Sequence, residues 1–206
     1  TYFGGLTKFD GTNWTVYNTS NSSLPNNWVS AIAIDGQGNK WVGTYFGGLA
    51  KFDGTNWTVY NTSNSRLPNN TVNAIAIDGQ GNKWIGTGNG LAKFDGTNWT
   101  VYNTTNSGLP SNSISAIVID AQGNKWIGTN GGGLVKFDGV NWTVYTPSNS
   151  NLVVNDIYEI LVDVQNIKWI GTNGGGFVKF DGTNWAVYNT SNSRLPSNVI
   201  NAIAID

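Results

Sequence analysis

The sequence predicts an all-β protein made of repeated four-stranded units, and three observations support this prediction. First, one tryptophan recurs every 42 or 43 residues, at Trp14, Trp57, Trp99, Trp142 and Trp185. Second, each repeat contains four short runs rich in β-branched and aromatic residues, separated by turns rich in Gly, Asn and Asp. Third, Gly or Pro interrupts every window that is long enough for an amphipathic helix.

The repeats divide the chain into five parts, which we expect to form a single domain over residues 1–206. They cover residues 1–43, 44–86, 87–128, 129–171 and 172–206. The last part lacks the equivalent of Gly-Gln-Gly-Asn-Lys-Trp-Ile-Gly. The chain starts within a motif and contains no Met, so we expect a processed product, an excised segment or part of a longer protein.

The second repeat shows the four expected strands in order. Gly48–Phe52 and Trp57–Tyr60 flank an Asp-Gly turn, which predicts a hairpin. A long polar connection follows, in which a Leu-Pro pair is expected to anchor the loop. Val72–Ile77 and Lys83–Thr87 then flank Asp-Gly-Gln-Gly-Asn, whose Asp and Asn bond the local backbone while Gly adopts positive φ.

Four strands in every 40–45 residues are the signature of a β-propeller blade. We name the strands A (Val72–Ile77), B (Lys83–Thr87), C (Gly48–Phe52) and D (Trp57–Tyr60), from the axis outward. Counting gives five A, four B, five C and five D strands, or about five blades. The first C and D strands would share a blade with the last A strand, unless the chain is an excerpt of a larger ring.

The motif Asp-Gly-Gln-Gly-Asn-Lys-Trp-Ile-Gly-Thr, followed by Gly-Gly-Leu-Ala-Lys-Phe-Asp-Gly, resembles the two-component regulator propeller repeat of bacteria. The resemblance extends over the whole chain. It implies a propeller fold and an extracellular or periplasmic protein, either a sensor-kinase region or a secreted repeat protein. The motif order is also similar to the tryptophan-docking repeats of quinone-dependent dehydrogenases, which implies that Trp41, Trp84, Trp126 and Trp169 pack between blades.

Composition excludes several classes of function. Charged residues make up 11% of the chain and the net charge is −1, so we expect no nucleic-acid partner. No apolar run approaches the length of a membrane span, so we expect no membrane insertion. Cys and His are absent, and the Asp-containing turns lack the spacing of a calcium loop, so we expect neither metal nor cofactor.

The repeated tryptophans have two interpretations. They could stack on sugars, which would make the protein a multivalent carbohydrate-binding lectin. The preferred interpretation is packing, because one aromatic residue at the same strand position of each repeat suits a core. Trp28 differs, because it occurs once, in the connection between a D strand and the next A strand.

The candidate binding residues lie in the B–C and D–A loops, which emerge on the same face of a propeller. Side chains in these loops vary on a repeated scaffold, either because binding differs there or through neutral drift. The candidates are Tyr2, Phe3, Trp28, Tyr45, Phe46, Asn89, Asn130 and Asn173. We expect a protein or a glycan as the ligand on this face.

Glu159 is the only Glu and replaces an Ala that the other A strands carry. We expect it to line the central channel, because an unpaired buried carboxylate is costly. A carboxylate-dependent glycosidase would need a second carboxyl group roughly 5–10 Å away. The sequence therefore favours a non-catalytic extracytoplasmic binding or interaction scaffold, including a sensory one, over a lectin, and over an enzyme.

Overall fold

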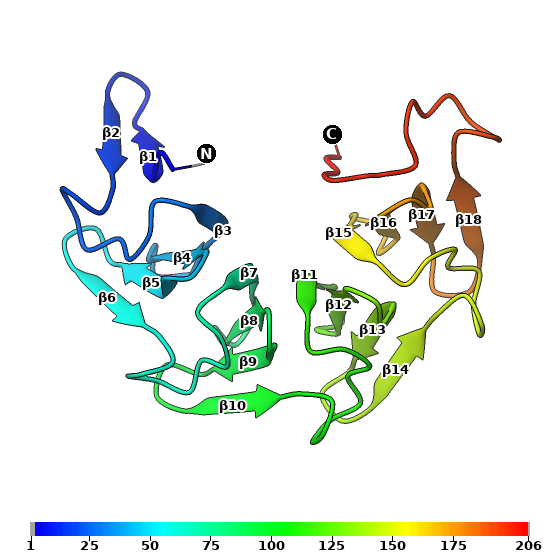
Figure 1. Cartoon of the computed structure of the whole chain (residues 1–206), viewed down its shortest axis with the longest axis horizontal. Helices are drawn as coiled ribbons and strands as arrows, with labels where there is room; N and C mark the ends of the chain where they lie inside the picture. The colour runs from blue at the N-terminus through cyan, green and yellow to red at the C-terminus, as the bar shows by residue number, and fades with distance from the viewer. Residues whose placement is uncertain (1–2, 206) are drawn as a thin grey trace. The chain divides into compact units, whose positions relative to one another are not determined.

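The computed structural model describes residues 3–205 and shows an all-β protein (Figure 1). Its 18 strands form four four-stranded sheets and one two-stranded sheet, all antiparallel. No part of residues 3–205 is helical, and so no helix in this range could cross a membrane. The all-β class and the four-stranded blades predicted from the sequence are confirmed.

The strands of each sheet follow one another in chain order (Figure 1). The N-terminal hairpin, a partial blade, contains β1 (Leu6–Phe9) and β2 (Trp14–Tyr17). Blade 1 contains β3 (Val29–Ile34), β4 (Lys40–Thr44), β5 (Gly48–Phe52) and β6 (Trp57–Tyr60). Blade 2 contains β7 (Val72–Ile77), β8 (Lys83–Thr87), β9 (Gly90–Phe94) and β10 (Trp99–Tyr102).

The remaining two blades repeat this arrangement. Blade 3 contains β11 (Ile114–Ile119), β12 (Lys125–Thr129), β13 (Leu134–Phe137) and β14 (Trp142–Tyr145). Blade 4 contains β15 (Ile157–Val162), β16 (Lys168–Thr172), β17 (Phe177–Phe180) and β18 (Trp185–Tyr188). The A and B strands share one register in every blade, with the same irregularity after the first residue of strand A.

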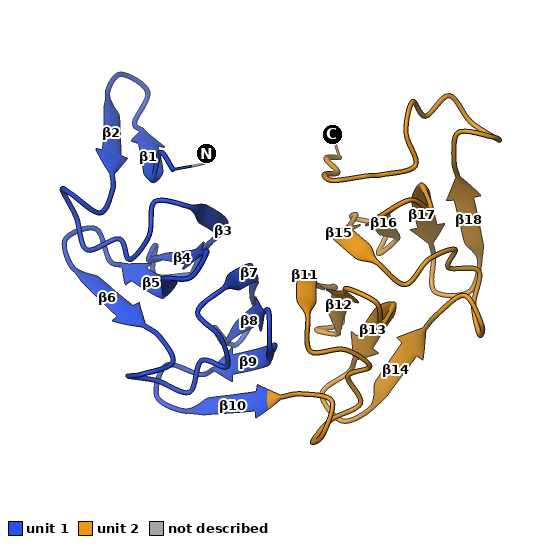
Figure 2. Ribbon diagram, viewed as in Figure 1, with its two compact units in different colours: residues 1–101 blue, residues 102–206 orange. Residues whose placement is uncertain are grey.

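The chain forms two compact units (Figure 2). Unit 1 covers residues 1–101, which hold the N-terminal hairpin, blade 1 and most of blade 2. Unit 2 covers residues 102–206, which hold blades 3 and 4. The boundary falls inside β10. The expectation of one closed five-bladed domain stays a prediction.

Large side chains from strand B fill the space between neighbouring blades of the same unit. In unit 1, Trp41 is 2% exposed and stacks on Tyr60 of its own blade. Phe94 of blade 2 contacts the same indole edge-on, with ring centroids 6.0 Å apart. Trp126 has the equivalent neighbours, Tyr145 and Phe180, in unit 2. The predicted packing between blades is thus confirmed for Trp41 and Trp126, whereas Trp169 is half-buried and stacks on Phe177 of its own blade.

Small residues on one blade receive large residues of the next. A Cβ atom added at Gly43 would lie 2.6 Å from Val72 Cγ1, which belongs to the following A strand. A Cβ atom at Gly128 would lie 2.7 Å from Ile157 Cγ2 in unit 2. Such distances leave no room for a methyl group, so glycine in strand B sets how closely successive blades approach.

The expected fifth A strand is not formed. Residues 200–205 have no strand geometry, and the preceding residue, Val199, forms an isolated bridge with Asn173. Ile200 still donates its N–H to Thr172 O, as an inner strand would. A strand needs a hydrogen-bonded neighbour, and the B-strand sequence that would pair with this segment is not in the chain. The prediction of five A strands was wrong here, because it counted the last A motif as a strand although the sequence contains no B strand to pair with it.

Candidate functional site

Four aromatic side chains of unit 1 form a connected cluster on the loop face. Phe3 contacts Trp28 edge-on, with ring centroids 5.7 Å apart. Trp28 stacks on Tyr45 at 4.5 Å, and Tyr45 contacts Phe46 at 4.2 Å. We call these four residues the aromatic loop patch. The structure thus brings together four of the residues that the sequence predicted as separate binding candidates. Tyr2 lies outside the described residues.

The two phenylalanines at the ends of the patch are the exposed ones. Phe3 is 72% exposed and Phe46 is 70% exposed, whereas Trp28 and Tyr45 are half-buried. Burying such side chains on a partner would remove large apolar areas from water. The patch therefore has a half-buried centre, Trp28 and Tyr45, and two exposed rings, Phe3 and Phe46, that a ligand can contact.

Both exposed phenylalanines adopt a strained backbone conformation. Phe3 has φ 63° and Phe46 has φ 64°, in the left-handed region that non-glycine residues rarely adopt. The equivalent positions in unit 2 are Gly131 and Gly174, with φ values of 80° and 95°. A bulky residue in this conformation costs of order 1–3 kcal/mol relative to an unstrained one. The sequence analysis selected Phe3 and Phe46 because these loops vary between repeats, but it did not use the contrast of Phe with Gly at a position of positive φ.

Backbone hydrogen bonds hold the centre of the patch in place. Tyr45 donates its N–H to Trp28 O at 2.9 Å, which joins the B–C loop to the D–A loop. Trp28 N–H in turn donates to Asn26 Oδ1 at 2.8 Å. The two loops therefore present their rings as one surface.

The three asparagine candidates do not join this patch. In unit 2, Asn130 donates from Nδ2 to Ser113 Oγ, and its N–H donates to Ser113 O. Asn173 donates its N–H to Asp156 O. Asn89 lies exposed in the short B–C turn of blade 2, where its N–H donates to Thr87 Oγ1. These backbone contacts fasten their loops without forming an exposed cluster.

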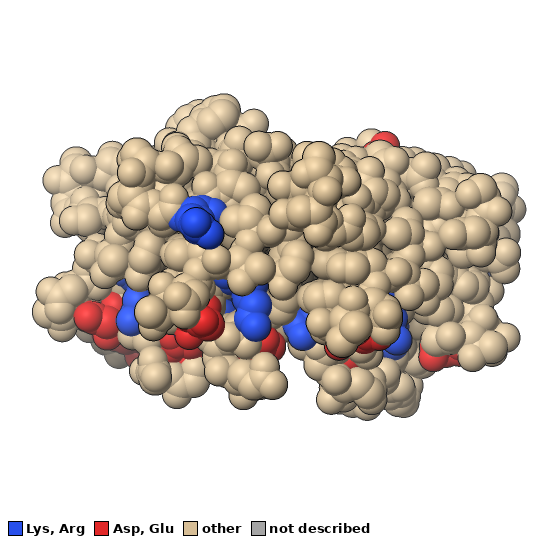
Figure 3. All heavy atoms as spheres, turned by 90° about the horizontal axis from the view of Figure 1, so that it is seen from below, with Lys and Arg blue, Asp and Glu red and all other residues tan. Residues whose placement is uncertain are grey.

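Charged side chains are concentrated at the other ends of the strands. Figure 3 shows the visible charged atoms gathered mainly along one edge of the surface. The A–B turns hold Asp35, Asp78, Asp120 and Asp163, and the C–D turns hold Asp10, Asp53, Asp95, Asp138 and Asp181. The aromatic loop patch itself contains no Asp, Glu, Lys or Arg side chain.

The A–B carboxylates stabilise their own turns. Asp35 accepts hydrogen bonds from the Trp41 indole, from the Asn39 side chain and from two backbone N–H groups. Burial alone would raise the pKa of Asp35, but these bonds outweigh it and lower the pKa to about 2. These contacts agree with the turn-capping role predicted from the sequence. Within residues 3–205, no three acidic, His or Cys side chains are arranged to hold a metal ion.

Glu159 is half-buried on β15, where it pairs with Gly171 of β16. Burial raises its pKa above the ordinary value of 4.5, and one hydrogen bond from Ile160 N–H opposes the shift. No other carboxylate is among the groups that shift this pKa. The position on the inner strand agrees with the expected channel location, which stays a prediction.

The comparisons with known proteins support the fold and the repeat type. A family model described as Two component regulator propeller matches residues 23–46, 66–89 and 108–131. Three repeats therefore match the two component regulator propeller repeat over these segments. Each match covers an A strand, its A–B turn and the following B strand. The resemblance inferred from the sequence is confirmed for these repeats. No relative among curated proteins matches the chain.

Solved structures include similar propellers with different roles. The extracellular domain of the hybrid two component system BT3049 from B. thetaiotaomicron is 28% identical, with a TM-score of 0.78 over 88% of this chain and 26% of that one. PorZ, a surface component of the type-IX secretion system of Porphyromonas gingivalis, is 21% identical, with a TM-score of 0.75 over 100% of this chain and 34% of that one.

An enzyme is also among the structures with this fold. Virginiamycin B lyase from Staphylococcus aureus is 15% identical, with a TM-score of 0.65 over 84% of this chain and 58% of that one. The chain thus spans a quarter to a third of the first two proteins and less than two thirds of the lyase. Because the fold occurs in enzymes and in surface proteins, the function must be argued from the site.

Proposed function

We propose that this chain is a non-catalytic, extracytoplasmic binding module that holds a protein segment on the aromatic loop patch. The observation that supports this most directly is the exposure of Phe3 and Phe46 in strained conformations, at positions where unit 2 has glycine. A protein does not need this strain to fold, because Gly131 and Gly174 form the same loop without it. Strain of this kind is a reason to look for a functional role.

The chemistry of the patch favours a protein partner over a sugar. Aromatic side chains are typical anchors of protein interfaces, where they contribute much of the binding energy and the contacts around them contribute little. A sugar site adds polar side chains beside the stacking ring, whereas Asn26 beside Trp28 already accepts a backbone hydrogen bond. The repeated tryptophans Trp41, Trp84 and Trp126 are each 2% exposed, so they offer no series of equivalent sugar platforms.

The similarity to extracellular and surface proteins supports the proposed location outside the cytoplasm. The proposal that no reaction is catalysed is supported by Glu159, whose pKa is shifted by burial and one N–H rather than by a second carboxylate. Two coupled carboxyl groups are the usual minimum for glycoside hydrolysis.

A peptide-display experiment tests the proposal. Random short peptides on phage are selected against the immobilised chain, and their affinities are then measured for variants. We expect Phe46→Gly and Trp28→Ala to weaken the selected peptides at least about tenfold, which corresponds to about 1.4 kcal/mol for one anchor. Phe46→Gly should fold normally, because glycine occupies the equivalent loop position in unit 2.

The matched control is Val140→Thr, which removes an 82% exposed apolar side chain from unit 2. Thr occupies the equivalent position in the other C–D turns, at Thr12, Thr55, Thr97 and Thr183. Peptides that bind Phe46→Gly and Trp28→Ala as tightly as the parent chain would overturn the proposal. Glycans that bind on an array through Trp28, with no peptide selected, would replace it by the lectin hypothesis.

A further inference from the structure

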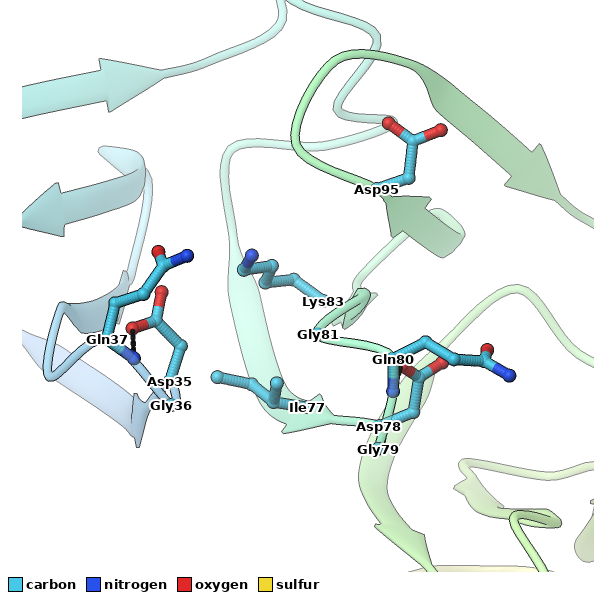
Figure 4. Close-up of a pocket in the computed structure, with 10 residues that line it drawn as sticks. All are labelled: Asp35, Gly36, Gln37, Ile77, Asp78, Gly79, Gln80, Gly81, Lys83 and Asp95. Carbon is cyan, nitrogen blue, oxygen red and sulfur yellow. Dashed lines mark hydrogen bonds between the residues drawn. The ribbon is translucent and has the colours of Figure 1, made fainter.

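A pocket of about 400 Å³ lies in unit 1, at the ends of the strands opposite the aromatic loop patch (Figure 4). It lies between the A–B turn of blade 1, residues 35–39, and that of blade 2, residues 78–82. Its volume falls within the range of about 300–1,000 Å³ that is typical of small-molecule sites. The proposed protein-binding function makes no use of this pocket.

Lys83 of β8 supplies the cationic group of the pocket. The residue is only 9% exposed, and its ammonium donates no hydrogen bond to any acceptor in residues 3–205. It lies 4.9 Å from the centre of the Trp41 ring, a cation–π contact that offsets part of the cost of burial. A buried ammonium ordinarily has a hydrogen-bonded partner, because desolvation of a charge is costly.

Gln37 faces this ammonium from the neighbouring turn. Figure 4 shows the two side chains reaching toward each other from different blades, while Gln80 points away. Gln37 Oε1 accepts one hydrogen bond from Asn39 Nδ2 at 3.2 Å. An amide oxygen can accept two hydrogen bonds, so Oε1 keeps one acceptor site, and Nε2 donates none within the described residues. The Gln37 amide and the Lys83 ammonium are therefore both available to a ligand.

The equivalent side chains of unit 2 show what satisfies this pair. Lys168, which corresponds to Lys83, donates from Nζ to Asn166 O at 2.7 Å. Gln122, which corresponds to Gln37, accepts at Oε1 from Asn166 Nδ2 at 2.6 Å. One residue therefore presents an acceptor to the lysine and a donor to the glutamine.

Unit 1 lacks the side-chain half of this bridge, because Gly81 stands where unit 2 has Asn166. The acceptor of Lys168 is the main-chain carbonyl of Asn166, and Lys83 forms no such bond with the carbonyl of Gly81. Both positions have positive φ, 81° for Gly81 and 64° for Asn166. A Cβ atom added at Gly81 would meet no heavy atom within 4 Å. The space that Asn166 bridges in unit 2 is therefore open in unit 1, with the lysine and glutamine retained.

Three carboxylates also line the pocket, and they determine which charges a ligand can carry. Asp35 and Asp78 point their oxygens into their own turns, where each accepts a tryptophan N–H, an asparagine amide and backbone N–H groups. With Asp95, they give the lining three negative charges against the one positive charge of Lys83. A ligand with only a negative group would be repelled by this net negative charge. A ligand that also carries a positively charged group would not.

We propose that this pocket binds a small zwitterion of the free amino acid class. Its carboxylate accepts hydrogen bonds from the Lys83 ammonium, as Asn166 O does for Lys168 in unit 2. Its ammonium donates to Gln37 Oε1, as Asn166 Nδ2 does to Gln122, and lies in the negative field of Asp78 and Asp95.

Titration calorimetry of the whole chain with each of the common amino acids tests this site. Acetate and methylamine, which carry only one of the two charges, serve as reference probes. We expect at least one amino acid to bind at least about tenfold more tightly than either reference. The tryptophan fluorescence of the chain should change on binding, because the ligand alters the cation next to the Trp41 ring. The change should be absent in Lys83→Met.

Two variants and a control connect binding to this pocket. Gly81→Asn copies the bridge of unit 2 and should weaken binding at least about tenfold, and Lys83→Met removes the ammonium while keeping an apolar stem. Gly38→Asn is the control, because Gly38 has the same φ of 81° and the same open surroundings but does not line the pocket.

The proposal is overturned if no amino acid binds better than acetate, or if Gly81→Asn and Lys83→Met bind as tightly as the parent chain. An affinity that falls equally in Gly38→Asn would also overturn it, since the effect would then come from the turn and not from the pocket. These outcomes do not depend on the aromatic loop patch.

Discussion

Unit 1 has Phe46 and Gly81 in loops at opposite ends of its strands, whereas unit 2 has Gly131 and Asn166 at the equivalent positions. Unit 1 therefore has the larger side chain at the first position and glycine at the second, which gives it an exposed aromatic surface and an open pocket. Unit 2 has an unstrained loop and a bridged turn in their place. The strands between these loops have the same register and bury apolar side chains at equivalent positions, such as Trp41 and Trp126. The comparison thus distinguishes the residues that form the core of a blade from the loop residues that differ between the two units.

The largest expected effect tests whether the cores are equivalent. Trp41→Ala and Trp126→Ala should each lower the free energy of unfolding by about 3–5 kcal/mol, because each removes a fully buried indole that joins two blades. Urea unfolding followed by circular dichroism measures the loss. Trp14→Ala is the control, because Trp14 is 69% exposed and should cost about 1 kcal/mol. A small loss in only one of the units would break the equivalence.

The second prediction concerns the spacing of blades. Gly43→Ala and Gly128→Ala should each cost about 1–3 kcal/mol, because the added methyl group would overlap Val72 or Ile157 of the next blade. Gly36→Ala, where nothing lies within 4 Å, provides the control. Thermal unfolding of the three variants gives the comparison. If Gly43→Ala and Gly36→Ala unfold at the same temperature, strand B does not set the blade spacing.

The third prediction concerns the A–B turns. Asn39 donates from Nδ2 to both carboxylate oxygens of Asp35, whereas the equivalent residue beside Asp163 is Ile167. Asn39→Ala should therefore cost about 1–2 kcal/mol, and Ile167→Asn should gain about 1 kcal/mol through a restored charge-assisted bond.

The gain from Ile167→Asn should disappear in acid. Hydrogen bonds from Trp169 and the backbone outweigh burial and lower the pKa of Asp163, so the carboxylate stabilises the turn above its unfolded pKa and loses this effect as pH falls through the lower folded pKa. Unfolding measured at pH 7 and near pH 2 checks this. A gain that persists at the lower pH would show that the asparagine acts through packing instead.

The fold was predictable because it depends on short-range patterns that the repeats display several times. The alternation in Val72–Ile77 and the Asp-Gly turns gave the strand limits that the structure shows. The candidate site was only partly predictable. Trp28 and Phe46 were identifiable as unusual loop residues, but their contact depends on how two loops meet. The role of Lys83 was hidden, because every B strand begins with lysine and Lys40 and Lys125 also follow a glycine two residues earlier. Lys83 differs from these two lysines in its burial, which the sequence does not display.

The smallest expected effect concerns Glu159, which occupies the position of Ala74 and has no equivalent in unit 1. Burial raises its pKa, so the folded state binds a proton more tightly than the unfolded state does. Stability from this group is therefore complete below the unfolded pKa and is lost as pH rises through the raised folded pKa. Ionised Glu159 should consequently destabilise the blade at neutral pH.

Replacing Glu159 by Gln should then raise the free energy of unfolding at pH 8 by up to about 1 kcal/mol, since water screens a half-exposed carboxylate. At pH 4, where the glutamate is largely protonated in both states, the variant and the parent chain should unfold alike. Glu159→Ala should also be neutral or slightly stabilising at pH 8, because Ala74 and Ala116 occupy this position in other blades. A loss of several kcal/mol at pH 8 would instead show that the carboxylate is paired, and would point to a specific site in blade 4.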